Sequence, residues 1–295
     1  MSGVSSGVMS GHSAPPSAGR GPLPQKFPHE PARIRKAAEL IVAMRRGEIE
    51  IQGETGFDEA TRPRNRDEAQ QISDLVIELL GRPVLGWKFY IGAMIQQAPL
   101  RTPIYDIWQS PAVLPKEASQ HRWIEPELAC RCLRDFPPRE KIYGYQEIAD
   151  GMEIVPAFEV IGPRFRFDSA AHMRQVVNGY RINPRFDGLA DGNASGGYVV
   201  GQARKDWQEL DFLKMHVTMD AGEERLVDTV GGHPLVDPFM SMFPLINLMR
   251  NREGLKAGML MATHSYSGFI PVPAKVKIVS SFTYFNPIEA VFEGD

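Results

Sequence analysis

The segment Trp123–Cys132 constrains the fold more than any other part of the sequence. It reads Trp-Ile-Glu-Pro-Glu-Leu-Ala-Cys-Arg-Cys and places Glu125 and Glu127 in an otherwise largely apolar stretch. In a β-strand, side chains two positions apart point to the same face, whereas on a helix these two would diverge. We therefore predict a strand in which the two glutamates share one face. The opposite face, which we expect to pack against a core, carries Ile124, Leu128, Cys130 and Cys132.

Two carboxylates held side by side repel each other, so a shared proton, a nearby cation or a metal ion must compensate. Ligands that offer only oxygen suit a hard ion such as Mg²⁺ or Mn²⁺. The alternative is an edge strand whose two glutamates face solvent, and Pro126 favours an edge or a bulge. The spacing alone leaves both interpretations open.

A third acid lies in a second apolar segment, Ile154-Val-Pro-Ala-Phe-Glu-Val-Ile-Gly, where Glu159 is the only charge between Glu153 and Arg164. Burying a lone carboxylate is costly unless it is paired or binds an ion. Glu159 is thus a candidate third metal ligand. Alternatively, it faces outward or pairs with Arg164.

The remaining chain predicts a mixed α+β fold: a tail at 1–30, a small helical part at 31–82 and a β-rich domain at 83–295. Apolar periodicity predicts two helices, Ala32–Arg46 ended by Gly47, and Arg66–Leu80 capped by Asn65 and ended by Gly81. Strands follow rather than alternate with helices, which favours α+β over a doubly wound sheet. The other predicted elements are strands at Val84–Lys88, Ile154–Ile161, Tyr198–Gly201, Leu213–Met219, Gly258–Thr263 and Val276–Phe285, and a helix at Pro238–Arg252 that is capped by Asp237 and kinked or started late by Pro244.

Composition excludes several classes of function. A net charge of −3 and 43% hydrophobic residues suggest one substantial core and give no reason to expect nucleic acid or a membrane surface as partner. No secretory signal, apolar run of membrane-spanning length or nucleotide-binding fingerprint is present. The Gly-, Ser- and Pro-rich residues 1–30 predict disorder. Two cysteines, Cys130 and Cys132, predict a reduced, cytoplasmic protein in which both are small buried side chains.

Three further segments carry residues capable of chemistry. Lys88, between apolar and aromatic neighbours, has either a lowered pKa suited to proton transfer or an ammonium that reaches the surface. Two polar loops follow, and their side chains are either substrate ligands or ordinary turn residues. The candidates in these loops are Asp191, Asn193 and Ser195 in the first and Thr263 and Ser265 in the second.

The order of these segments resembles the 2-keto-4-pentenoate hydratase family of the fumarylacetoacetate hydrolase superfamily. Across roughly residues 30–285 the resemblance rests on Gly86-Trp-Lys, Ile124-Glu-Pro-Glu-Leu-Ala, Pro156-Ala-Phe-Glu-Val-Ile-Gly-Pro-Arg, Ala190-Asp-Gly-Asn-Ala-Ser-Gly-Gly, Gly232-His-Pro-Leu, Leu255-Lys-Ala-Gly and Thr263-His-Ser-Tyr-Ser-Gly. Gly192 and His264 depart from the family pattern, which suggests an unusual substrate.

This resemblance implies a homo-oligomeric enzyme with Mg²⁺ or Mn²⁺ on Glu125, Glu127 and Glu159. Lys88 and Asp191 would be catalytic, with Ser195 on the substrate side. The implied reaction is addition of water to a 2-hydroxy-2,4-dienoate from aromatic meta-cleavage, through a metal-stabilised enolate. A metal-dependent decarboxylase of the 4-oxalocrotonate type, a C–C hydrolase and a non-catalytic binding protein are the alternatives.

Overall fold

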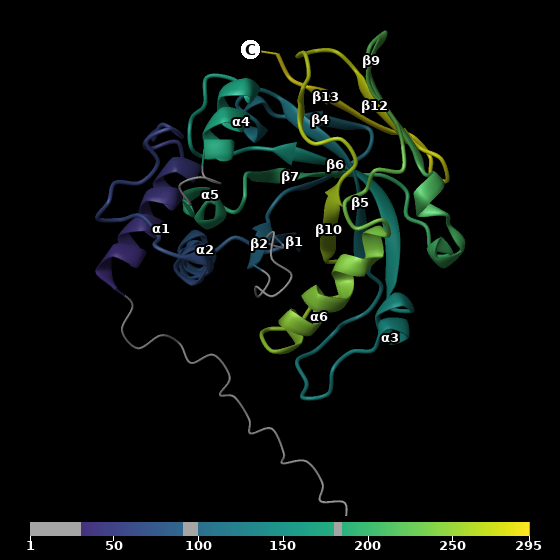
Figure 1. Cartoon of the computed structure of the whole chain (residues 1–295), viewed down its shortest axis with the longest axis horizontal. Coiled ribbons are helices and arrows are strands. Elements are labelled where there is room, and N and C mark those ends of the chain that lie inside the picture. Colours follow the sequence, from purple (N-terminus) through teal and green to yellow (C-terminus); the bar gives the residue numbers. More distant parts are fainter. Residues whose placement is uncertain (1–30, 91–99, 180–184, 295) are drawn as a thin grey trace, which may run out of the picture.

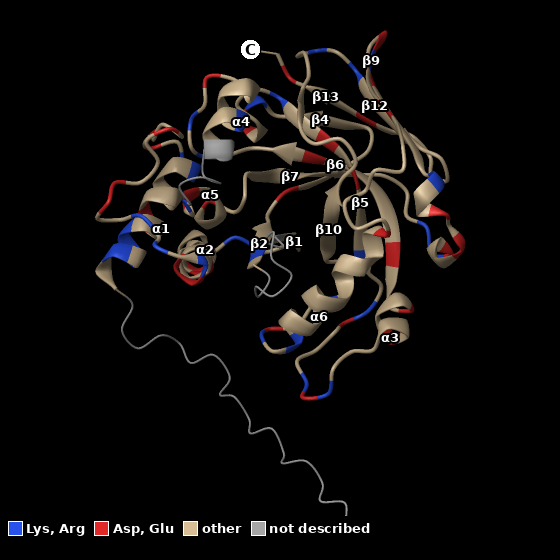
Figure 2. Cartoon of the chain, in the orientation of Figure 1, with Lys and Arg blue, Asp and Glu red and all other residues tan. Residues whose placement is uncertain are grey.

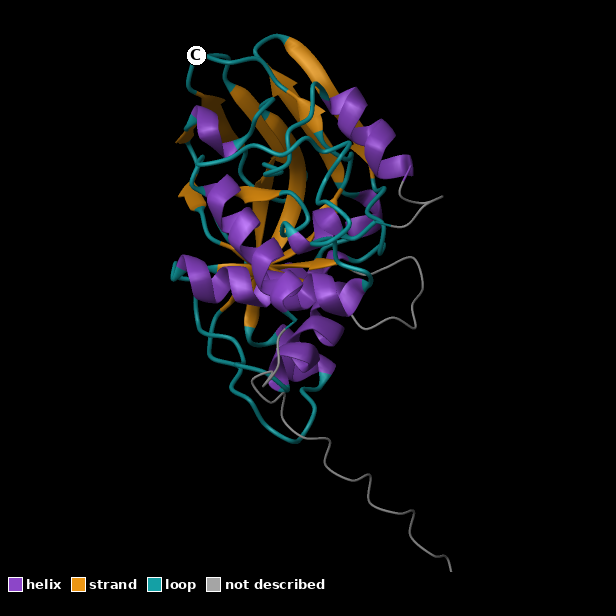
Figure 3. Cartoon of the chain, turned by 90° about the vertical axis from the view of Figure 1, so that its left-hand side faces the viewer, coloured by secondary structure: helices purple, strands orange, loops and turns teal. Residues whose placement is uncertain are grey.

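The computed structural model describes residues 31–90, 100–179 and 185–294. Within them, helices flank two β-sheets: α1 and α2 lie at the left of Figure 1, and α3 and α6 at its lower right. The second sheet, with β4, β12 and β13, lies at the top near the C-terminus. Seen from the left side, helices cross in front of the strands (Figure 3). The predicted tail at 1–30 lies outside the described residues.

The two N-terminal helices form where the sequence predicts them, as α1 (Ala32–Arg45) and α2 (Arg66–Leu80). The side chain of Asn65 accepts a hydrogen bond from the backbone N–H of Glu68 at 2.9 Å, which satisfies one free donor of the first turn of α2. Gly81 ends α2 in the left-handed conformation, at φ 62°. The buried faces of both helices pack against residues that follow β6, so this helical part shares a core with the rest of the chain.

The first sheet carries the candidate site. In the described part of the chain its strand order is β2-β1-β10-β5-β6-β7-β3, with β11 paired to β5. β5 is therefore central, paired antiparallel to β6 and β10. The alternative interpretation of an edge strand, which Pro126 favours, is therefore wrong. The strands of this sheet are β1 (Gly86–Tyr90), β2 (Leu100–Ile104), β3 (Ile107–Gln109), β5 (Trp123–Cys132), β6 (Met152–Ile161), β7 (Ser195–Val200), β10 (Leu260–Ser265) and β11 (Ile270–Pro271).

The second sheet covers the opposite face of β5. Ile124, Leu128, Cys130 and Cys132 are buried in a core that also contains side chains of this sheet and of α6, and both cysteines are free. The predictions of a core face and of buried cysteines are thus confirmed. The order of the second sheet is β4-β13-β12-β8-β9. Its strands are β4 (Ala112–Leu114), β8 (His216–Ala221), β9 (Glu224–Val230), β12 (Ile278–Phe282) and β13 (Ile288–Phe292).

The mixed α+β class is the one observed, with several differences in the bounds of individual elements. The predicted Pro238–Arg252 helix is a 3₁₀ turn at Pro238–Ser241, capped by Asp237, followed by α6 (Met242–Arg250). The late start is correct, since Pro244 falls in the first turn of α6, where its missing N–H costs little. The remaining helices are α3 (Tyr145–Ala149), α4 (Ala170–Gly179) and α5 (Asp187–Ala190), and 3₁₀ turns at Lys116–Ala118, Trp207–Glu209 and Phe212–Lys214. No described helix combines the length and apolar character that a membrane span requires.

Candidate metal centre

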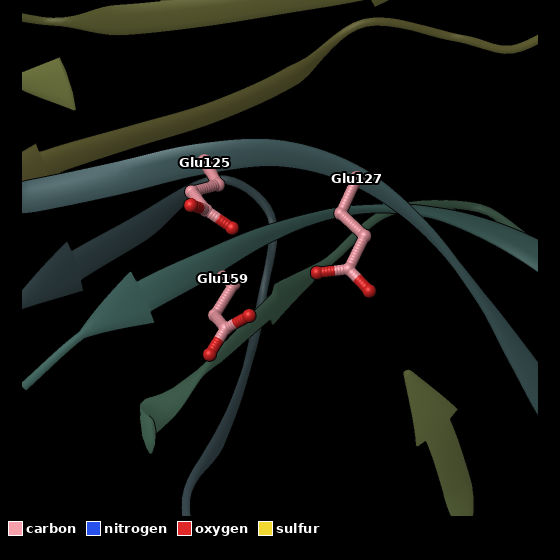
Figure 4. Close-up of side chains that lie close together, drawn as sticks. All are labelled: Glu125, Glu127 and Glu159. Atoms are coloured by element: carbon pink, nitrogen blue, oxygen red, sulfur yellow. The ribbon is translucent and has the colours of Figure 1, made fainter. Parts of the chain in front are cut away.

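Three glutamates converge on one face of the first sheet. Glu125 and Glu127 lie on β5, and Glu159 on β6 is the direct cross-strand partner of Glu125. One carboxylate oxygen from each lies within 4.8 Å of the others. Figure 4 shows the three side chains pointing into a common space, and Figure 2 shows acidic segments on the ribbons of β5 and β6. Local alternation aligns the first two acids, and strand pairing supplies the third.

Glu127 is fixed by an irregularity in the neighbouring strand. β10 shifts register between Ala262 and His264, and this bulge directs two successive backbone N–H groups at one carboxylate oxygen. The N–H groups of Thr263 and His264 donate to Oε1 of Glu127 at 2.7 and 2.8 Å. The second oxygen, Oε2, is buried without a hydrogen-bond partner in the described structure. Buried polar atoms are rarely left unpaired, so this oxygen is an available ligand for an ion.

Burial and mutual repulsion perturb the carboxylates. Burial raises the pKa of Glu125 to about 7, and the charge of Glu159 adds to the effect. Burial also raises the pKa of Glu127 well above its usual range, with Glu159 and Glu125 adding to it. Both effects make the ionised forms costly. A divalent cation on the three oxygens would reverse that cost.

Lys88 is the basic partner of this cluster. Its Nζ donates to Oε1 of Glu159 and, at 3.1 Å, to the backbone oxygen of Asn193. Burial acts to lower the pKa of Lys88, but the attraction of Glu159 and Glu125 outweighs it and the pKa is raised. The predicted lowered pKa and the surface-reaching alternative are therefore both wrong here, since the side chain is only 14% exposed.

A glycine brings Lys88 to the site. β1 approaches β10 so closely that a Cβ on Gly86 would lie 2.1 Å from the backbone oxygen of Leu260. Only glycine fits such an approach of two backbones. Lys88 is two residues further along β1, so this close approach of β1 to β10 lies next to the lysine in the sequence.

The donor set suits a hard divalent ion. All three candidate ligands offer carboxylate oxygens, and Lys88 is the basic side chain paired with Glu159, which leaves a formal charge of −2 on the ionised cluster. Mg²⁺ and Mn²⁺ prefer such oxygen ligands. The alternatives for Glu159 do not apply, because it is 2% exposed and its ion pair is with Lys88 rather than Arg164.

The first polar loop lies beside the cluster, but its acid points elsewhere. The carboxylate of Asp191 accepts a hydrogen bond from the backbone N–H of Arg164 at 2.7 Å and lies 3.9 Å from the guanidinium of Arg45. Asn193 contributes its backbone oxygen to Lys88, as described above. Ser195 begins β7 opposite Ile161. Among the predicted residues of this loop, the described contacts connect only Asn193 to the carboxylate cluster.

The hydroxyls of the second polar loop are engaged in structure. Thr263 donates its hydroxyl to the backbone oxygen of Leu128. Ser265 accepts hydrogen bonds from the N–H groups of Ser267 and Gly268 at 3.1 and 2.9 Å. The backbone N–H of Thr263 is therefore its contribution at the site, through Glu127.

Two side chains near the site carry no predicted role in the sequence. Tyr198, on β7 directly opposite Glu159, is fully buried, and burial together with Glu127 and Glu159 raises the pKa of its phenol well above the usual range. His264 has a φ of 142°, which non-glycine residues rarely adopt, and a buried Nδ1 without a partner in the described structure. Burial, and to a smaller extent the positive charge of Lys88, lowers the pKa of His264 to about 4. No sequence pattern marks Tyr198, because its place depends on the pairing of β6 with β7.

The site and fold can now be compared with known proteins. No family model matches the chain, and no curated protein matches it in sequence. Among solved structures, 4-oxalocrotonate decarboxylase from Pseudomonas putida G7, complexed with calcium and acetate, has a TM-score of 0.67 at 18% identity and covers 88% of this chain and 97% of its own. The same enzyme complexed with magnesium and adipate gives a TM-score of 0.67 at 19% identity, with the same coverage.

The chain shares the fold of this decarboxylase. This likeness agrees with the mixed α+β fold class that the sequence predicts. At 18–19% identity the likeness establishes the fold alone. The reaction has to be argued from the site.

Proposed function

We propose that this chain is a metal-dependent enzyme that adds water to a 2-hydroxy-2,4-dienoate or the related 2-oxo-enoate. The observation that carries the proposal is the convergence of Glu125, Glu127 and Glu159, with oxygens within 4.8 Å of one another and Lys88 paired with Glu159. A purely structural role would leave a net negative charge buried, which is strongly destabilising. Binding of Mg²⁺ or Mn²⁺ removes that penalty.

The substrate class follows from the same donors. A divalent ion held here supplies a Lewis acid for the 2-oxo and carboxylate oxygens of the substrate. Lys88 remains an ammonium in this environment, so it can hold negative charge that develops on the substrate and donate a proton to it. Anchored through Asn193 and Glu159, its Nζ has a fixed position before substrate binds.

His264 and Tyr198 add polar groups beside the reacting region. The imidazole of His264, with a pKa of about 4, is neutral near pH 7 and can donate or accept a hydrogen bond. The phenol of Tyr198 stays protonated because its pKa is raised. A neutral imidazole and a neutral phenol are suited to orienting a water molecule or a substrate oxygen without adding charge.

Decarboxylation is the second candidate. It is favoured by the fold likeness to 4-oxalocrotonate decarboxylase, over 88% of this chain. Both reactions pass through an enolate of a 2-oxo acid, and the donor set serves either. Product analysis separates them: hydration yields a product heavier by one water, whereas decarboxylation yields a product lighter by one CO₂.

The test uses purified full-length chain with Mg²⁺ or Mn²⁺. The ultraviolet absorbance of a 2-hydroxydienoate is followed over time, and the product mass is measured at the end. Loss of absorbance with gain of water supports the hydratase, and release of CO₂ from 4-oxalocrotonate supports the decarboxylase. A chain that binds metal but converts neither substrate would instead be a binding protein.

The residue control is a matched pair of variants. Glu127→Ala removes a proposed ligand and is expected to abolish metal-dependent turnover. Glu289→Ala removes a glutamate from β13, in the other sheet, and is expected to leave turnover unchanged. If Glu127→Ala kept both metal binding and full turnover, the metal centre would not be the catalytic site.

A further inference from the structure

A second pocket, of about 350 Å³, lies where the C-terminal ends of α1 and α2 meet β3 and the start of β7. Neither the three clustered glutamates nor Lys88 lines it. Its volume falls within the range of small-molecule sites. The side chains that dominate it are basic: four arginines, Arg45, Arg46, Arg82 and Arg164.

Among the residues that line this arginine pocket, the four arginines outnumber the two acids, and Arg46 also lies 3.9 Å from Glu48. Two acids line the pocket, Asp106 and Glu117, and Asp106 is paired with Arg82 at 2.7 Å. Asp191, just behind it, lies between Arg45 and Arg164 but approaches the former only to 3.9 Å. Two arginines at the end of α1 also interact favourably with the helix dipole. The helix dipole therefore accounts for the location of Arg45 and Arg46, but it does not account for the location of Arg82 and Arg164 in the same pocket.

Buried donors without partners gather in the same place. In the described structure, Nε of Arg45, Nε of Arg164 and the hydroxyl of Tyr105 are buried and make no hydrogen bond. Both Arg45 and Arg82 also stack near the Tyr105 ring, with guanidinium carbons 5.4 and 5.3 Å from its centroid. Unsatisfied buried donors are rare in proteins. Three of them belong to residues that line one basic pocket, so its wall holds polar groups with unused hydrogen-bonding capacity.

The desolvation of Arg164 strengthens the case. Burial, followed by the nearby charge of Arg45, lowers its pKa to about 10. Its guanidinium donates to the backbone oxygens of Gly162 and Ser195, and it forms no ion pair within the described residues. A guanidinium in such a setting gains most from an oxyanion that it can bind through two N–H groups.

We propose that the arginine pocket binds a small organic oxyanion, of the dicarboxylate or phosphate-ester class, separately from the metal centre. Guanidinium groups and a phenol provide the donors, and Trp108 provides an apolar wall. The pocket also touches the loop that supports the site: Asp191 and Ser195 contact its arginines, while Asn193 holds Lys88. A bound anion is thus placed to influence the position of the loop and, through it, the lysine.

The test is calorimetric titration of the metal-free, full-length chain, in the presence of a chelator, with succinate in one arm and inorganic phosphate in the other. Saturable one-site binding in at least one arm is expected, and the arm that binds identifies the class of anion. The variant Arg82→Gln should weaken binding by about tenfold, the effect of losing one charge-assisted contact. Arg82 is 48% exposed in its side chain, so the variant should fold.

The matched control is Arg225→Gln, which removes an equally exposed arginine paired with Asp220 and Asp228 at the β8–β9 edge. It should bind the anion as the wild type does. Glu127→Gln should also leave anion binding unchanged, so failure of the metal centre does not imply failure of this site. Non-saturable heats in both arms, or equal weakening by Arg82→Gln and Arg225→Gln, would overturn the proposal.

Discussion

Replacement of Glu127 by glutamine separates a metal ligand from a structural acid. The amide retains an oxygen for the N–H groups of Thr263 and His264, which donate to Oε1 at 2.7 and 2.8 Å. At the position of the unpartnered Oε2 it places an uncharged NH₂ group. The change therefore preserves the local hydrogen bonds and removes one of three close negative charges.

The expected gain in stability without metal follows from the distances. Two unit charges 4.8 Å apart repel by about 3 kcal/mol at an effective dielectric constant of about 20. Because burial raises the pKa of Glu127 well above its usual range, the free energy recovered is smaller than this full repulsion. We expect the variant's free energy of unfolding in chelator to rise by about 1–3 kcal/mol. The melting temperature should rise by about 2–10 °C.

Addition of Mg²⁺ or Mn²⁺ should reverse the order. At a hundredfold excess over Kd, the wild type gains about 3 kcal/mol, whereas the Glu127→Gln variant lacks a ligand and gains little. Thermal unfolding with chelator and with each metal measures both effects, and Glu289→Gln is the matched control in the second sheet. A variant less stable than wild type in chelator, or equally stabilised by metal, would refute the reasoning.

Three other perturbations test the site. Because the pKa of Glu125 is raised from 4.5 to about 7, the folded chain binds more protons than the unfolded chain between these pH values. Without metal, the free energy of unfolding should therefore fall as the pH rises through this window, whereas the affinity for metal should increase. Denaturation and metal titration at several pH values measure the two effects. Lys88→Met should abolish turnover and keep metal binding. It should also destabilise the metal-free chain by about 2–4 kcal/mol, because Glu159 loses its cation. Unchanged turnover in a kinetic assay would exclude the lysine from the mechanism. His264→Gly should stabilise the chain by about 1 kcal/mol or more, because φ 142° suits glycine, and a lower melting temperature would show that the imidazole contacts outweigh the strain.

Features that depend only on residues close together in the sequence could be predicted from it. The bounds of β5 are those that the apolar run predicts, Trp123–Cys132. Asn65 and Gly81 mark the ends of α2 because a cap acts through its own side chain and backbone angle. The shared face of Glu125 and Glu127 follows in the same way from the alternation of a strand.

Most of the missed strands are very short or lie at sheet edges, whereas β13 lies between β4 and β12 inside the second sheet. β9 reads Glu-Arg-Leu-Val-Asp-Thr-Val and is mostly exposed, so its composition suggests a loop rather than a strand. Pairing with β8 makes it a strand, and a single sequence does not encode that partner locally. The strands β3 and β4 are only three residues each, too short to show a period.

The residues of the site also differ in whether they could be predicted from local sequence or only from strand pairing. Alternation within β5 gave two ligands, but the pairing of β5 with β6 put Glu159 opposite Glu125, and the pairing of β6 with β7 brought in Tyr198. These registers are set by contacts between segments far apart in the sequence, and a shift of one residue would move Glu159 to the other face. The apolar setting of Glu159 marked it as a candidate, and the family resemblance joined it to Glu125 and Glu127 because a family motif carries such a register implicitly. The motifs that carry the family resemblance do not include Tyr198. The register of β6 and β7 was therefore needed to place its phenol at the site.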